Sequence, residues 1–149
     1  MPIKKLKEFL DKNRIKYSTI HHSPAYTAQE IAEISHISAK ELAKTVIMKV
    51  DDRLVMVVLP AHHKVSFEKI KQATKAKAVD LASELEFQKK FPGCELGAMP
   101  PFGNLFNMEV YVEKDLTQDP MIAFNAGSHS ELIKLTFSDF AKLVKPQVI

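Results

Sequence analysis

Apolar side chains recur at helical spacing at the start of the chain, where Ile3, Leu6 and Phe9 stand three residues apart. This period predicts an amphipathic helix that runs to Asn13. The segment 17–20 then alternates between polar and apolar positions, which predicts a short strand.

Two capping sequences follow, Thr27–Glu30 and Ser38–Glu41. Each places a hydroxyl residue three positions before a glutamate, so that both side chains can accept hydrogen bonds from N–H groups of a first helical turn. We expect one helix to begin at Thr27. A second, short helix is expected to lead from Ser38 into Lys44.

The strongest strand pattern lies in the middle of the chain. Lys44–Val50 and Leu54–Leu59 are rich in β-branched residues, and the connection between them is short enough for a hairpin. Three later segments are also expected to be strands: 108–112, 121–125 and 132–135.

Serines mark the starts of the later helices, because a serine hydroxyl can accept a hydrogen bond from the first turn. The segments expected to be capped in this way are 66–73, 83–91 and 138–143. In the last of them Phe140, Leu143 and Val144 would face inward. Together the elements predict an α/β fold in which helices pack against a mixed sheet.

The composition suits an ordinary globular protein. A chain of 149 residues can bury most of its apolar surface in one core, so we expect a single domain over 1–149. The first 75 residues hold 14 Lys and Arg against 8 Asp and Glu, a balance that could attract a phosphate backbone or could belong to solvated helix faces. An early charged stretch, no long apolar run and a single cysteine favour a cytoplasmic protein without a membrane segment.

The most unusual segment is 92–103, which carries three of the four glycines and three of the eight prolines. Glycine tolerates positive φ and proline restricts its neighbours, so such a segment can hold an irregular backbone with exposed N–H groups. We therefore expect a shaped loop here.

Common catalytic signatures are absent from the sequence, including the nucleophile elbow, the phosphate-binding loop, the dinucleotide fingerprint and paired C-x-x-C motifs. Two histidine pairs, 21–22 and 62–63, raise the question of a zinc site. Adjacent strand residues point to opposite faces, however, and no metal site is expected. Cys94 is either a nucleophile or an inert thiol of the loop, and the lack of a supporting motif favours the second interpretation.

Two further segments carry side chains suited to chemistry. Lys44 stands where a capped helix gives way to a strand, and it is either a site residue or a surface lysine. Asn125–His129 follows a predicted strand. It is either a plain turn, for which Asn and Gly are well suited, or a place where His129 orients a substrate or moves a proton.

Taken in order, three segments resemble the YbaK/ProX (YbaK/EbsC) family of aminoacyl-tRNA deacylases: Lys44-Thr45-Val46, Gly97–Gly103 and Asn125–His129. The segment 23–27 is similar to the family's early segment. The resemblance implies a free-standing relative of the editing domain of bacterial prolyl-tRNA synthetases, with a mixed, partly barrel-like sheet flanked by helices. It also implies ester hydrolysis on mischarged tRNA without a metal or other cofactor.

The resemblance assigns roles to particular residues. The predicted catalytic residues are Lys44, Gly97 and Ala98. The predicted substrate-binding residues are Tyr26, Thr27, Met99, Pro100, Pro101, Phe102, Gly103, Asn125, Ala126, Gly127 and His129. Many family members have a second glycine and a hydroxyl residue where this chain has Ala98 and Pro100, and this difference bears on which amino acid is accepted.

An activated ester needs its carbonyl held, a water placed and the oxyanion stabilised, and loop N–H groups can do the last of these. We therefore expect the loop amides to bind the carbonyl, and Lys44 to hold the terminal phosphate or ribose as a point charge. A ribose hydroxyl could assist the water. Met99 and Phe102 are candidates for the pocket wall.

The expected substrate is tRNA, held by its acceptor end, that carries a small wrong amino acid of the Ala, Ser, Thr or Cys class. An aminoacyl-tRNA synthetase is a further expected partner. Two alternatives stay open: a non-catalytic regulator that binds tRNA or a synthetase, and a general nucleic-acid-binding protein. The second lacks the aromatic stacking pattern of known RNA-binding motifs.

Overall fold

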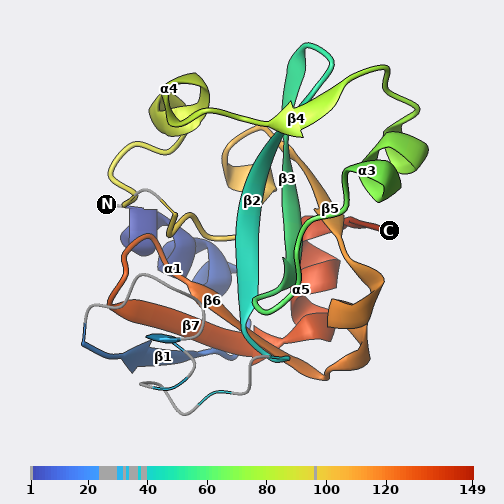
Figure 1. Ribbon diagram of the computed structural model, residues 1–149. Coiled ribbons are helices and arrows are strands. Elements are labelled where there is room, and N and C mark those ends of the chain that lie inside the picture. Colours follow the sequence, from blue (N-terminus) through green and yellow to red (C-terminus); the bar gives the residue numbers. More distant parts are fainter. Residues whose placement is uncertain (1, 24–29, 32, 34–36, 38–39, 96) are drawn as a thin grey trace.

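The computed structural model describes residues 2–23, 30–31, 33, 37, 40–95 and 97–149 (Figure 1). The strands are β1 (Ser18–His21), β2 (Ala43–Val50), β3 (Arg53–Pro60), β4 (Val79–Leu81), β5 (Glu109–Val112), β6 (Met121–Asn125), β7 (Glu131–Thr136) and β8 (Gln147–Val148). The helices are α1 (Pro2–Lys12), α3 (Phe67–Thr74), α4 (Glu84–Phe87) and α5 (Phe137–Val144), with 3₁₀ turns at Gln88–Lys90, Gly103–Leu105 and Lys114–Gln118.

The strands form two sheets. The larger has the order β4-β2-β3-β5-β8, in which β3 pairs with β5, and β5 with β8, in parallel, while the other pairs are antiparallel. The smaller sheet is antiparallel, with the order β1-β7-β6. Figure 1 shows the smaller sheet beside the start of β2, with α3 and α4 at opposite sides of the larger sheet.

Among the described residues, one isolated parallel bridge joins the two sheets, between Leu42 and Ala123. The Ala123 N–H donates to the Glu41 carbonyl at 3.0 Å, and the Ala61 N–H donates to the Leu42 carbonyl at 2.8 Å. The predicted mixed α/β fold is confirmed. Its strands are divided between two sheets that meet where β2 begins and β6 passes.

The predicted hairpin is confirmed, since β2 and β3 pair from Ala43 with Pro60 to Val50 with Arg53. Ser66 caps α3 by accepting from the Lys69 N–H at 3.3 Å. Ser83 caps α4 in a complete capping box with Glu86.

Two helix predictions need correction. The helix from Ser83 was expected to reach Phe91, but α4 ends at Phe87 and a 3₁₀ turn continues to Lys90. The closing helix is capped by Thr136, whose hydroxyl accepts from the Asp139 N–H at 3.1 Å, and not by Ser138. Strand β7 ends at Thr136 in extended geometry, so the helix can start two residues earlier than its serine suggests.

The helix predicted from Thr27 begins outside the described residues. Of the short helix predicted from Ser38, the described residues Lys40 and Glu41 form a turn. Strand β8 was not predicted, because two exposed residues leave almost no periodic signal.

The largest core cluster joins α1, α5 and both sheets around Phe102. The Phe102 ring meets Phe124 at 5.5 Å and Phe140 at 5.4 Å between ring centroids. Phe140 is fully buried as predicted, and Leu143 and Val144 pack on the same cluster while half-buried. No helix in the described part of the chain is long and apolar enough to cross a membrane.

Candidate functional site

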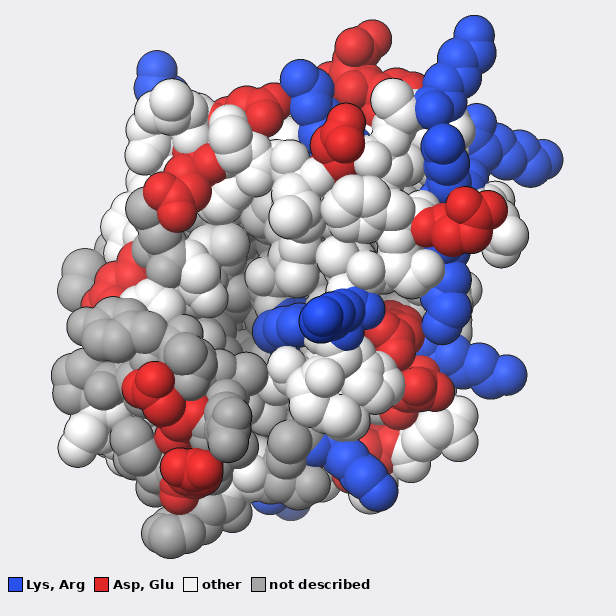
Figure 2. All heavy atoms as spheres, in the orientation of Figure 1, with Lys and Arg blue, Asp and Glu red and all other residues white. Residues whose placement is uncertain are grey.

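Three segments that are distant in the sequence meet around one small cavity of about 180 Å³. They are the start of β2, the glycine loop (residues 92–103) and the end of β6. The lining residues are Ile31, Leu42, Ala43, Lys44, Thr45, Ala61, Gly97 and Asn125. Figure 2 shows a hollow in the face that β2 crosses, with Lys or Arg side chains at its rim.

Lys44 is placed by the sheet register. It pairs with Leu59 of β3. On the other side of β3 runs the parallel strand β5, and Glu113, the residue after β5, lies beside Leu59. The Glu113 N–H donates to the Val58 carbonyl at 2.9 Å. Lys44 and Glu113 therefore share one face of the sheet, two strands apart. Burial lowers the pKa of the Lys44 ammonium, and the negative charge of Glu113 opposes this by raising it.

Gly97 has a backbone that only glycine adopts readily, with φ at +84°. The His129 ring lies next to it, because a Cβ built on Gly97 would be 3.5 Å from His129 Cε1. No described residue accepts a hydrogen bond from the Gly97 N–H. Gly97 is exposed and lines the cavity, so its amide is suited to bind an oxygen atom.

The glycine loop and the turn after β6 are joined by backbone hydrogen bonds. The Glu95 N–H donates to the Gly127 carbonyl, and the Gly127 N–H donates to the Ala98 carbonyl, both at 2.9 Å. The Ala98 N–H donates to the Glu95 carbonyl at 3.0 Å, so the amide of this predicted catalytic residue is already used within the loop. Ala98 shapes the loop, and Gly97 presents the amide.

The end of β6 contributes Asn125 to the cavity. Its Oδ1 is buried and has no hydrogen-bond partner among the described residues, so it is an acceptor available to a ligand. His129 is 9% exposed, and its backbone N–H donates to Glu95 Oε2 at 3.1 Å. Gly127 has φ at +101° and Ala126 donates to the Glu131 carbonyl, so these two residues build the turn.

The other predicted residues are not brought to the cavity. Met99, Pro100, Pro101, Phe102 and Gly103 are buried, and none of them lines it. They anchor the loop to the core instead. The predicted contacts Tyr26 and Thr27 lie outside the described residues.

Cys94 lies in the same loop and is half-buried. Burial raises the pKa of its thiol to about 11, so the thiol is protonated at neutral pH. Because the thiolate is the nucleophilic form, this favours the interpretation of an inert thiol.

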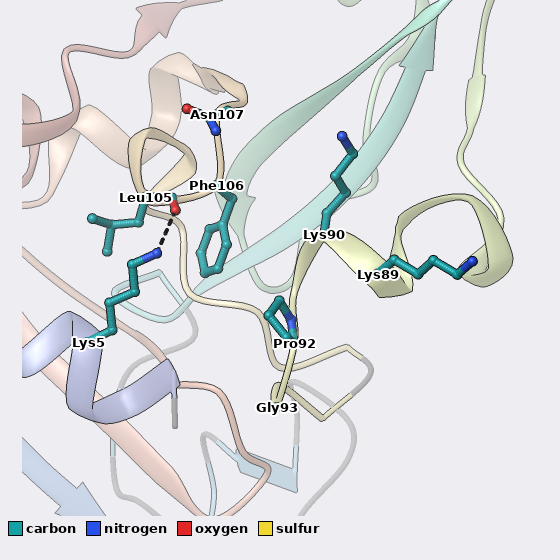
Figure 3. A pocket seen from close by; sticks show the side chains of 8 residues that line it. All are labelled: Lys5, Lys89, Lys90, Pro92, Gly93, Leu105, Phe106 and Asn107. Carbon is teal, nitrogen blue, oxygen red and sulfur yellow. Dashed lines mark hydrogen bonds between the residues drawn. The ribbon is translucent and has the colours of Figure 1, made fainter.

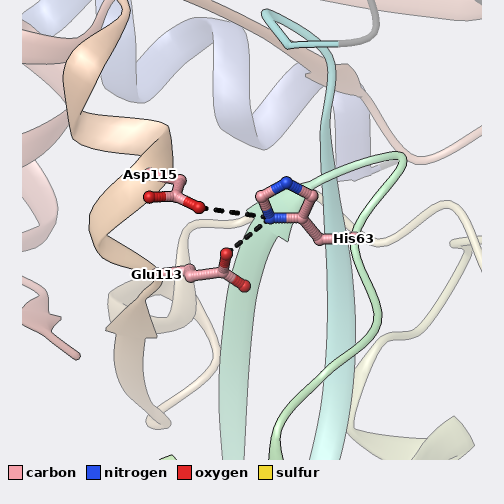
Figure 4. A group of neighbouring side chains, drawn as sticks. All are labelled: His63, Glu113 and Asp115. Carbon is pink, nitrogen blue, oxygen red and sulfur yellow. Dashed lines mark hydrogen bonds and ion pairs between the residues drawn. The ribbon is translucent and has the colours of Figure 1, made fainter.

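A cluster that the sequence did not predict lies next to Lys44 and contains His63, Glu113 and Asp115 (Figure 4). His63 Nδ1 lies 2.5 Å from Glu113 Oε1 and 3.7 Å from Asp115 Oδ2. Their ligand atoms all lie within 4.8 Å of one another, so these residues could hold a divalent ion. The sequence singled out His63, in the pair 62–63, but not the two acids, because they lie about 50 positions further along the chain.

The fold and the cavity define a mixed α/β protein with a small polar site built from three distant segments. The profile of the aminoacyl-tRNA editing domain matches residues 22–143, and the chain belongs to this family. The resemblance to the YbaK/ProX proteins is thereby confirmed.

Individual relatives agree with this assignment. The prolyl-tRNA editing protein ProX of Acetoanaerobium sticklandii is 26% identical over 142 residues, which cover 91% of this chain and 86% of that protein. The proline–tRNA ligase of Bacillus subtilis (strain 168) is 30% identical over 112 residues, 74% of this chain. The matched part is 20% of that ligase and 15% of the ligase of Bacillus cereus (strain AH187), so the chain corresponds to a small part of these enzymes.

Solved structures have the same fold. A candidate trans-editing enzyme for prolyl tRNA synthetase superposes with a TM-score of 0.83 at 17% identity, covering 99% of this chain and 94% of the other. The hypothetical protein APE2540 gives 0.86 at 20% identity, covering 97% and 96%.

Proposed function

We propose that this protein hydrolyses the ester between a small, wrongly attached amino acid and the end of a tRNA, in the cavity between Lys44, Gly97 and Asn125. The observation that carries the proposal is the meeting of these three residues at one cavity, since each comes from a different segment. Family membership supplies the reaction class, and the relatives named as proline–tRNA ligases and as ProX support a proline-accepting tRNA as the carrier.

The reaction needs no protein nucleophile. A water attacks the ester carbonyl carbon, the carbonyl oxygen gains negative charge, and the bond from the carbonyl carbon to the ribose oxygen then breaks. One proton of the water goes to the leaving ribose oxygen and the other to solvent, so the amino acid is released as a carboxylate. The adjacent ribose hydroxyl can direct the attacking water, as expected from the sequence.

The protein groups have separate roles in this proposal. The Gly97 N–H binds the developing oxyanion, and the Lys44 ammonium holds the terminal phosphate or ribose. The buried Asn125 Oδ1 accepts a hydrogen bond from the α-ammonium group of the amino acid. No step requires a metal ion.

The size of the cavity supports a small amino acid. At about 180 Å³ it is smaller than pockets for drug-sized ligands, which span roughly 300 to 1,000 Å³. Exclusion by size separates amino acids weakly, because one methylene is worth about 1 to 3 kcal/mol. A small cavity can therefore reject a bulky residue more easily than it can separate Ala from Ser.

A deacylation screen tests the function. A proline-accepting tRNA charged with Ala, Ser, Thr, Cys or Pro is incubated with the protein, and the remaining ester is measured over time. We expect rapid loss of at least one small amino acid and retention of Pro. A protein that binds the charged tRNA but leaves every ester intact is the non-catalytic regulator instead.

The pH dependence of the reaction is expected to report on Glu113. Its charge raises the pKa of Lys44, so Glu113→Gln should lower that pKa further, and Lys44 should lose its proton at lower pH. The alkaline limb of the kcat/KM profile should then move to lower pH, after correction for uncatalysed hydrolysis. The exposed Glu109 provides the matched control, Glu109→Gln. Identical alkaline limbs for the wild type and Glu113→Gln would show that Glu113 does not affect the protonation of Lys44.

A further inference from the structure

A second, larger cavity lies on the other side of the glycine loop. It is a groove of about 680 Å³, and none of the described residues that line it is acidic. Its lining residues are Lys5, Lys89, Lys90, Pro92, Gly93, Leu105, Phe106 and Asn107. Figure 3 shows Lys5 and Phe106 on one side of this groove, with Pro92 and the two other lysines on the opposite side.

The aromatic wall of the groove is held by contacts with its neighbours. The Phe106 ring packs against buried Phe91 at 4.5 Å between centroids, and Lys5 Nζ lies 5.6 Å from the Phe106 centroid. Lys5 also donates to the Leu105 carbonyl at 3.1 Å. A packed aromatic ring beside an ammonium group can receive a nucleobase, since every base has a π-face.

The opposite wall is cationic. Lys89 and Lys90 are exposed, and neither forms an ion pair with the residues that the structure describes. Their charges are therefore available to an anionic ligand. The combination of exposed cations, one aromatic ring and no carboxylate among the described lining residues suits a phosphodiester strand.

The groove is also close to the candidate active site. A smaller cavity of about 270 Å³ shares Lys89, Pro92 and Gly93 with the groove and extends to Met99. Gly93 and Gly97 are four residues apart, so an extended chain spans at most about 14 Å between them. This upper limit is about four times the spacing of about 3.4 Å per nucleotide along one strand of duplex DNA.

We propose that the Lys5–Lys89–Lys90–Phe106 groove binds the tRNA strand next to the esterified end, with phosphates on the lysines and a base on Phe106. This inference rests on the proposed function. It identifies the surface that holds the tRNA while the ester lies in the cavity at Gly97.

Binding of an uncharged proline-accepting tRNA transcript, measured by fluorescence anisotropy over a salt series, tests the groove. Lys89→Gln/Lys90→Gln should weaken binding roughly tenfold or more near 0.1 M salt and reduce the salt slope by about 1.5. Phe106→Leu, which preserves apolar packing, should weaken binding without changing the slope. The matched control is Lys69→Gln/Lys71→Gln on α3, where two exposed lysines lie outside the groove.

The groove assignment is overturned if the Lys89/Lys90 variant binds like the wild type, or if the α3 variant weakens binding equally. Alanine esterified to adenosine provides a second readout, because this short substrate ends before the groove. The Lys89→Gln/Lys90→Gln variant should hydrolyse charged tRNA more slowly than the wild type does. It should hydrolyse the short ester at the wild-type rate. If the wild type hydrolyses neither substrate, the proposed function fails, while the anisotropy result still decides whether the groove binds tRNA.

Discussion

Lys44→Ala is expected to lower kcat/KM for the mischarged tRNA by about 100-fold, the size of effect seen when one electrostatic donor is removed from an active site. The half-buried ammonium is the cation that lines the cavity among the described residues, and its partly desolvated position strengthens its interaction with an anionic group. Single-turnover deacylation of the amino acid found by the screen measures the effect.

Two further variants make this result specific. Lys49→Ala removes a lysine from the same strand, where it pairs with Glu86 at an exposed position, and it should leave the rate unchanged. Lys44→Arg keeps the charge and should recover part of the activity. If Lys44→Ala hydrolyses the ester as fast as the wild type while remaining folded, Lys44 has no part in the reaction.

Gly103→Ala is expected to destabilise the protein by about 1 to 3 kcal/mol or more, because a Cβ at this position has no room. It would lie 2.5 Å from both the Met108 carbonyl oxygen and Val110 Cγ2. The backbone cannot move away easily, since the Phe106 and Met108 N–H groups both donate to the Gly103 carbonyl at 2.9 Å. Thermal unfolding should show a melting temperature lower by about 5 to 10 °C.

Gly97→Ala, in the same loop, is expected to lower the reaction rate while costing little stability. Among the described residues, a Cβ there meets the His129 ring at ordinary contact distances, 3.5 Å to Cε1 and 3.9 Å to Nε2, so the stability cost comes from positive φ and should be about 1 kcal/mol. A shifted Gly97 N–H should nevertheless reduce the rate about tenfold or more, because small misplacements at a reacting centre are costly. A melting temperature that falls as far for Gly97→Ala as for Gly103→Ala would show that the two glycines have the same structural role.

Local structure was largely predictable because it depends on neighbours in the sequence. The hairpin of β2 and β3 has a dense β-branched pattern and a short turn, and Ser66 and Ser83 cap helices as their spacing indicates. Thr136 replaced Ser138 as a cap because the end of β7 decides where the chain can turn into a helix. The end of β7 depends on its pairing with β6, which the local sequence pattern does not determine.

Part of the site was predictable for a different reason. Lys44, Gly97 and Asn125 carry the resemblance to the family, and the structure brings them to one cavity. The resemblance did not distinguish residues that face the cavity from residues that support it. Ala98 uses its amide inside the loop and Phe102 packs in the core, because burial depends on what α1, α5 and β6 place against the loop.

By itself the sequence determined most helices and strands, the mixed α/β class and the family, since periodicity, capping and ordered motifs are all written along the chain. Only the tertiary structure decided that the strands form two sheets joined at Leu42 and Ala123. It also brought Glu113 next to His63 and Lys44, and Lys5 opposite Lys89. These pairings depend on strand register and packing between segments tens of residues apart, and each segment's own pattern is compatible with many such arrangements.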